Sequence, residues 1–213
     1  MNLCRDWVVC LVAHSRVLVG GLPGVGKTTV LNMVAEQIKS AGMNVQLVVF
    51  GSVMMEEAKK IGVTDRDQLR FLPVPQQRSL QVTAAKKIHS ISSDFVLIDT
   101  HFVIRTPEGF WPGLPIDVLK EINPTHIIMI RAPVQSIIFR REQDKARKRD
   151  FEPPEQIEEE LELSRQFMVV ASAETGAPMK VIDNPEGKLE EAVSEFLSTI
   201  RVKVSARADG GRG

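Results

Sequence analysis

The chain has 213 residues, of which 43% are hydrophobic, so it can form one α/β domain with a sizeable core and lacks the composition of a disordered protein. Its 27 lysines and arginines balance 27 aspartates and glutamates, and this neutral net charge argues against nucleic acid as the main partner. No apolar run reaches the roughly 18–20 residues that span a bilayer, and the two cysteines lack metal-ligand spacing, so we expect no membrane partner and a reducing cytoplasm.

Three parts are expected along the chain. Residues 1–14 precede the first candidate core strand and are interpreted as an N-terminal extension. Residues 15–203 are expected to form a single domain. The remaining residues, 204–213, are small, basic and glycine-rich, and they are expected to be a disordered tail.

The first structured stretch contains the pattern G-x-x-x-x-G-K-[ST], which is typical of a phosphate-binding loop, or P-loop. A short β-branched run, 16–20, precedes it and reads as a buried parallel strand. An amphipathic helix follows, with apolar residues at positions 31, 34, 35 and 38, and Gly42 ends it. A strand before and a helix after are the context that this motif requires.

The residue types of the loop suit the binding of nucleotide phosphates. Glycines let backbone N–H groups approach phosphate oxygens, and the N-terminus of the following helix adds partial positive charge. Lys27 is expected to place its charge on the β- and γ-phosphates. The Thr28 hydroxyl is expected to bind Mg²⁺.

The rest of the chain alternates apolar strands with helices, which predicts a parallel sheet covered on both faces. The other strands are expected at 45–50, 95–99, 127–131 and 179–183. The other helices are expected around 51–61, 65–72, 80–91, 115–122, 133–141, 154–175 and 188–201. Residues 101–115, rich in glycine and proline, are expected to form a loop. The P-loop places the ligand at the carboxyl edge of the sheet, so further site residues should directly follow the other strands.

Asp99 ends the apolar run 95–98, and this arrangement is typical of a Walker B aspartate that acts on Mg²⁺ directly or through water. The alternative is an aspartate that caps a helix or a turn. His101 follows in the same turn, where it either fixes the loop or takes part in catalysis.

A charged segment lies after the fourth strand. Six cations fall within ten residues: Arg140, Arg141, Lys145, Arg147, Lys148 and Arg149. Taken alone, they indicate a solvated helix surface. Beside a P-loop they also fit a short closing lid at about 140–153, or a patch for RNA phosphates. Arg66, Arg70 and Arg105 are either surface arginines or candidates for binding a second substrate that carries a phosphate.

Several motifs in combination resemble the archaeal type of adenylate kinase over roughly residues 16–201. They are the segments at 21–29, 65–67, 99–101, 105–109, 113–115, 121–124, 147–150 and 180–182. The resemblance implies a P-loop NTPase three-layer sandwich with a five-stranded parallel sheet, strand order 2-3-1-4-5, and a short lid. It also implies a homotrimer that maintains adenine nucleotide levels by the Mg²⁺-dependent reaction ATP + AMP = 2 ADP.

The resemblance also assigns roles to residues by position. The ATP phosphates would be held by Gly21, Leu22, Pro23, Gly24, Val25, Gly26, Lys27, Thr28 and Thr29. Catalysis would depend on Lys27 and on the lid arginines Arg140, Arg147 and Arg149. The AMP side would use Ser52, Arg66 and Arg105, and Mg²⁺ would be held by Thr28 and Asp99.

Two other functions stay open at this stage. One is a kinase for another nucleoside monophosphate, because adenine is often recognised by backbone groups that residue types do not reveal. The other is a P-loop protein that binds RNA under the control of ATP and uses the basic lid as its contact surface.

Overall fold

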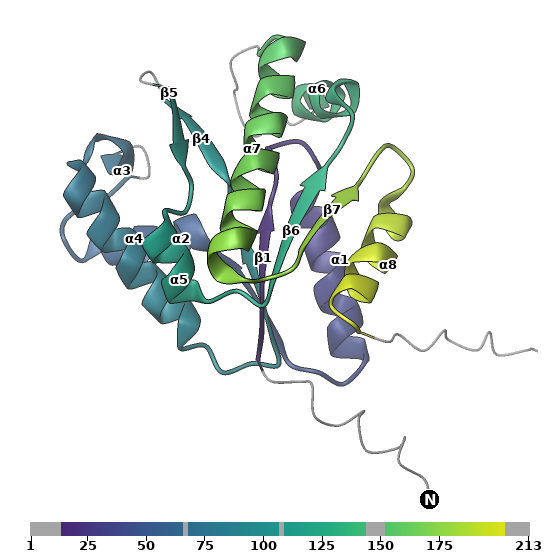
Figure 1. The fold of residues 1–213 in the computed structure, drawn as a ribbon, viewed down its shortest axis with the longest axis horizontal. Coiled ribbons are helices and arrows are strands. Elements are labelled where there is room, and N and C mark those ends of the chain that lie inside the picture. Colours follow the sequence, from purple (N-terminus) through teal and green to yellow (C-terminus); the bar gives the residue numbers. More distant parts are fainter. Residues whose placement is uncertain (1–13, 66–67, 107–108, 144–151, 203–213) are drawn as a thin grey trace, which may run out of the picture.

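The computed structural model in Figure 1 describes residues 14–65, 68–106, 109–143 and 152–202. The described residues form three layers, with a parallel sheet between two layers of helices. His14 is the only described residue of the expected N-terminal extension. The expected tail, 204–213, and lid residues 144–151 lie outside the described residues.

The central sheet has five parallel strands in the order β2-β3-β1-β6-β7. The strands are β1 (Ser15–Gly20), β2 (Val45–Val49), β3 (Phe95–Asp99), β6 (His126–Arg131) and β7 (Met179–Asp183). Counted within this sheet alone, the order is the expected 2-3-1-4-5. The apolar residues of β1, β3 and β6 are almost all buried, because these strands lie inside the sheet and are covered on both faces.

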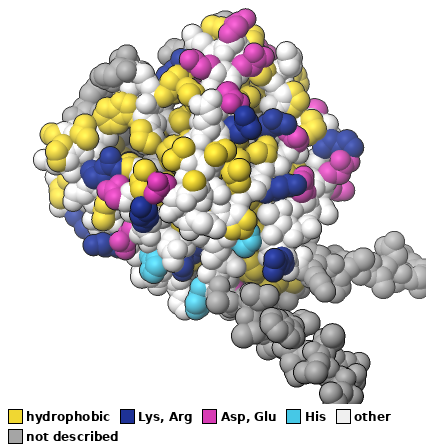
Figure 2. All heavy atoms as spheres, viewed as in Figure 1, with side chains coloured by type: hydrophobic (Ala, Val, Ile, Leu, Met, Phe, Trp, Pro, Cys, Tyr) yellow, Lys and Arg dark blue, Asp and Glu magenta, His cyan; other side chains and the backbone are white. Residues whose placement is uncertain are grey.

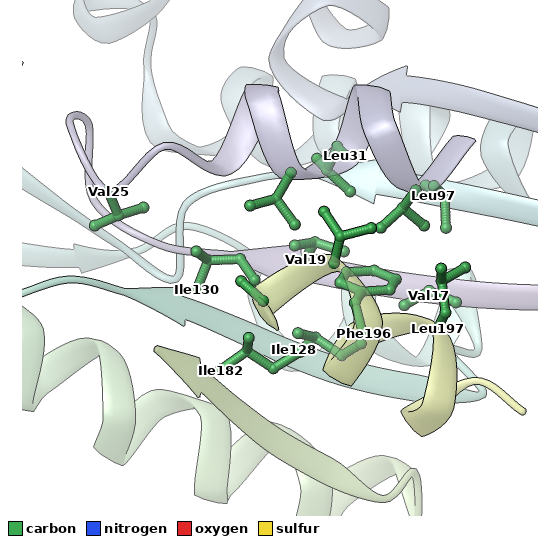
Figure 3. Close-up of a cluster of buried hydrophobic side chains, with 14 of the residues drawn as sticks. Val17, Val19, Val25, Leu31, Leu97, Ile128, Ile130, Ile182, Phe196 and Leu197 are labelled. Atoms are coloured by element: carbon green, nitrogen blue, oxygen red, sulfur yellow. The ribbon is translucent and has the colours of Figure 1, made fainter. Parts of the chain in front are cut away.

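Helices α1 (Lys27–Ser40) and α8 (Leu189–Thr199) cover one face of the sheet. Their buried side chains pack against strand residues in one continuous cluster, in which Phe196 is fully buried between Val19, Leu97 and their neighbours (Figure 3). Apolar residues at helical spacing in α1 and α8 therefore form this half of the core, as the sequence pattern predicts.

Four further helices pack on the opposite face, where a second buried cluster forms. They are α2 (Phe50–Lys59), α4 (Val74–His89), α5 (Ile116–Ile122) and α7 (Pro154–Thr175). The short α3 (Gln68–Phe71) precedes α4, and α6 (Val134–Gln143) leads into the charged segment. Among the described residues, no helix combines the length and the apolar character that crossing a membrane requires.

The prediction of a loop at 101–115 is partly wrong. It contains an antiparallel hairpin outside the main sheet, formed by β4 (Val103–Thr106) and β5 (Gly109–Pro112). Each strand has only four residues, and the glycines and prolines around them obscure the alternation that marks a strand. The second strand also ends earlier than expected, because Phe50 begins α2.

Candidate active site

The P-loop connects the carboxyl end of β1, a central strand, to the N-terminus of α1. Two of its glycines have positive φ angles and no room for a side chain. A Cβ on Gly21, at φ +153°, would lie 2.4 Å from the Ile130 carbonyl oxygen. A Cβ on Gly26, at φ +83°, would lie 2.4 Å from Asn184 Nδ2. The loop therefore needs glycine for its backbone conformation and for close packing against its neighbours.

The start of α1 is suited to an anion. Gly26 is the N-cap residue, and the first turn contains no acidic side chain. The first N–H groups of a helix have no partner inside the helix, so they can donate to phosphate oxygens. Thr28 and Thr29 are exposed in this turn and therefore accessible to a ligand.

Lys27 and Asp99 form an ion pair at the carboxyl end of the sheet, in which Lys27 Nζ donates to Asp99 Oδ1. Asp99 ends β3, which pairs with β1 beside the P-loop. The side chains are only 8% and 13% exposed. Burial lowers the pKa of Lys27 to about 8, while the Asp99 carboxylate favours the charged ammonium.

This pair brings two of the expected site residues into direct contact. The sequence predicts Lys27 on phosphates and Asp99 on Mg²⁺, whereas here the two side chains bind each other. Both lie at the P-loop, so the roles expected for them stay predictions consistent with their position.

Side chains from three other parts of the chain contact backbone carbonyls of the P-loop. His101 Nδ1 lies 3.1 Å from the Gly21 carbonyl oxygen, and Arg141 Nε donates to the Pro23 carbonyl oxygen at 2.9 Å. The Val25 carbonyl oxygen accepts from Asn184 Nδ2 at 2.8 Å and from Arg140 Nη1 at 3.1 Å. The contact of His101 is the one expected if that residue fixes the loop.

Arg140, an expected lid arginine, is thus bound to the P-loop. Its guanidinium also donates to the Asn184 carbonyl oxygen at 3.1 Å and forms an ion pair with Glu186 at 2.9 Å. The other two expected lid arginines, Arg147 and Arg149, lie outside the described residues.

The residues expected on the AMP side are less closely grouped. Ser52 is exposed in the first turn of α2, directly after β2, at the same edge of the sheet as the P-loop. Arg105, on β4, donates to the Gln156 carbonyl oxygen at 3.2 Å and lies 4.5 Å from the centroid of the Phe110 ring. These contacts join Arg105 to α7 and to the hairpin. Arg66 lies outside the described residues.

Asn184 was not singled out from the sequence, although it is 3% exposed and directly contacts the P-loop. It follows Asp183, the last residue of β7. The expectation that site residues directly follow the strands could have identified it.

The glycine loop between a central parallel strand and a helix, with a lysine–aspartate pair beside it, defines a P-loop nucleotide-binding domain. A family profile described as an AAA domain matches residues 20–158. Two solved structures share the fold at low sequence identity. A shikimate kinase from Acinetobacter baumannii in complex with shikimate has a TM-score of 0.59, with 18% identity, 89% of this chain and 94% of that chain covered. A shikimate kinase from Bacteroides thetaiotaomicron has a TM-score of 0.56, with 12% identity and 88% and 98% covered.

Several proteins have a higher sequence identity to this chain than these two structures have. An adenylate kinase from Methanocaldococcus jannaschii is 41% identical over 87% of this chain and 97% of its own length. Adenylate kinases from Pyrococcus furiosus and Methanopyrus kandleri are 40% and 39% identical, covering 90% and 87% of this chain and 98% and 97% of their own lengths. The chain belongs to the family of these archaeal adenylate kinases, and the resemblance seen in the motifs is confirmed.

Proposed function

We propose that the protein catalyses reversible phosphoryl transfer between ATP and AMP to give two ADP. The observation that carries this proposal is the similarity to archaeal adenylate kinases over nearly their whole length, with an intact P-loop at the carboxyl edge of the sheet. The N–H groups of the loop and of the first turn of α1 would hold the ATP phosphates. Lys27 would turn from Asp99 to the β- and γ-phosphates.

Mg²⁺ fits the oxygen donors at this site. Thr28 is exposed at the helix start, and Asp99 supplies a carboxylate at the tip of β3. Such a site suits Mg²⁺, which keeps several waters and binds through substrate phosphates and one or two protein oxygens. When bound, Mg²⁺ neutralises charge on the phosphates, and release of Asp99 from Lys27 would leave both side chains free for these roles.

The transfer itself needs no general base. A phosphate oxygen of AMP is already anionic, so it can form the new P–O bond to the γ-phosphoryl group as the bond to the β-phosphate oxygen breaks. The protein therefore contributes alignment and positive charge. Lys27 is the buried cation in place for this task, and we assign the lid roles to Arg140, Arg147 and Arg149.

On the acceptor side we assign Ser52, Arg66 and Arg105 to AMP. Ser52 lies at the ligand edge of the sheet, which supports this assignment, whereas Arg105 would have to release the Gln156 carbonyl to reach a phosphate. The function is tested by offering AMP, GMP, CMP or UMP with Mg-ATP as donor and measuring diphosphate formation. We expect AMP to be the preferred acceptor; clear preference for another base would make the protein a different monophosphate kinase.

We also propose that the chain forms a homotrimer in the cytoplasm. Apolar side chains that a buried interface would cover include Ile104 on β4 and Val169 and Val170 on α7, which are 37%, 43% and 48% exposed. Figure 2 shows hydrophobic side chains on the face where α7 lies. Light scattering coupled to size exclusion should give three times the mass of 23.7 kDa, and a monomer mass would contradict the trimer.

A further inference from the structure

We propose that Asn184 is a positioning residue that fixes the Val25–Gly26 peptide of the P-loop, so that the Gly26 N–H group faces the phosphates of ATP. This inference rests on the proposed function for the identity of the ligand. The geometry of the contact itself comes from the structure.

Two hydrogen bonds hold the backbone of Asn184 in place. Its own N–H donates to the Arg131 carbonyl oxygen at 2.7 Å, which extends the pairing of β6 and β7 by one residue. Its carbonyl oxygen accepts from Arg140 Nη2 at 3.1 Å. Its side chain is also buried, so the amide packs against neighbouring protein groups instead of solvent.

The side-chain amide of Asn184 contacts the Val25–Gly26 peptide. Asn184 Nδ2 donates to the Val25 carbonyl oxygen at 2.8 Å, and the same nitrogen would lie 2.4 Å from a Cβ on Gly26. In a planar trans peptide the C=O and the following N–H point in opposite directions. A hydrogen bond that holds the Val25 carbonyl on the Asn184 side therefore directs the Gly26 N–H to the opposite side of the loop.

Arg140 also donates to the Val25 carbonyl oxygen, but its surroundings differ from those of Asn184. Its side chain is 22% exposed at the end of α6 and pairs with the exposed Glu186. Asn184 is neutral and packed against Gly26. If Arg140 turns to the phosphates during the reaction, Asn184 keeps the Val25–Gly26 peptide oriented.

The test compares Asn184→Ala and Asn184→Asp with Thr125→Val. Asparagine and aspartate have similar shapes, but aspartate lacks the amide donor. Thr125 is the matched control, because its hydroxyl donates to the Arg16 carbonyl oxygen at 3.1 Å at the amino end of β6, away from the P-loop. Both Asn184 variants should lower kcat about tenfold and raise KM for ATP, with KM for AMP within twofold of wild type. Thr125→Val should leave kcat, KM for ATP and KM for AMP within twofold of wild type.

A second readout does not depend on turnover. Amide hydrogen exchange at Val25 and Val30, whose N–H groups donate to the Leu22 and Gly26 carbonyl oxygens, should be faster in both folded Asn184 variants and unchanged in Thr125→Val. Wild-type kcat and wild-type exchange in the Asn184 variants would overturn the proposal. If the Asn184 variants changed KM for ATP and KM for AMP equally, and Thr125→Val did the same, Asn184 would have only a structural role. If the wild type makes no ADP, the proposed function fails, while the exchange data still decide the role of Asn184.

Discussion

Breaking the Lys27–Asp99 pair separates its contribution to catalysis from its contribution to stability. Three variants are needed: Lys27→Met, Asp99→Asn and the double variant. Methionine has a long, flexible, neutral side chain, and asparagine keeps the shape of aspartate without its charge. Each single variant removes one charge of the pair and leaves the other without its partner.

The size of the stability effect follows from burial. With side chains 8% and 13% exposed, an unpaired carboxylate or ammonium at this place is poorly solvated. Removal of one partner from such a pair should lower the free energy of unfolding by about 3 kcal/mol. The double variant leaves no unpaired charge, so it should recover to within about 1 kcal/mol of wild type. Turnover should fall at least ~10²-fold in Lys27→Met and in the double variant, because both lack the charge on the phosphates.

Urea unfolding measures the stability of each variant, and coupled ADP formation with Mg-ATP and AMP measures turnover. Recovery of stability without recovery of turnover is the expected pattern. A double variant less stable than both single variants would show that the two charges do not stabilise each other. Turnover within tenfold of wild type in Lys27→Met would refute the catalytic assignment of the lysine.

Three further predictions concern binding and the core. Burial lowers the pKa of Lys27 to about 8, whereas bound phosphates favour its charged ammonium form. Above about pH 8, ATP binding should therefore be accompanied by uptake of a proton. Calorimetry should show that the affinity for ATP falls as the pH rises from about 8. Lys27→Arg, which stays charged, should bind with little pH dependence; a flat wild-type profile to about pH 10 would contradict the reasoning. Phe196→Ala should lower the free energy of unfolding by about 3–5 kcal/mol, measured in urea, because Phe196 is fully buried. The control Phe139→Ala, at a side chain that is 54% exposed, should change it by less than about 0.5 kcal/mol. Similar losses of stability in both variants would contradict the assignment of Phe196 to the core. In steady-state kinetics Arg105→Ala should raise KM for AMP about tenfold and leave KM for ATP unchanged. The control Arg78→Ala, which breaks an exposed ion pair with Asp117, should change neither constant. An unchanged KM for AMP in Arg105→Ala would remove Arg105 from the acceptor site.

The parts of the fold that the sequence predicts well are those with local signals. The P-loop motif, its strand and its helix lie within 26 consecutive residues, 15–40, and the buried strands are continuous apolar runs. The family resemblance then supplied the strand order, which the sheet confirms. The β4–β5 hairpin was missed because strands of four residues beside glycine and proline have little periodicity.

The contacts within the site depend on residues far apart in the chain, and these were harder to predict. Asn184 and Val25 are 159 positions apart, and Lys27 and Asp99 are 72 apart. Residue types indicated that Lys27 and Asp99 belong to one site, but not that the two side chains bind each other. Likewise, six cations within ten residues suggested a lid, while only the fold shows that Arg140 and Arg141 bind carbonyl groups of the P-loop.

The most direct test of the account is to incubate the protein with Mg²⁺ and ADP alone. Two bound ADP molecules occupy the donor and acceptor positions of one site, so a reversible transfer must produce ATP and AMP in equal amounts. Chromatography of the nucleotides measures both products. We expect ATP and AMP to appear together at a one-to-one ratio until equilibrium. Unchanged ADP, or AMP accompanied by free phosphate instead of ATP, would contradict the proposed activity.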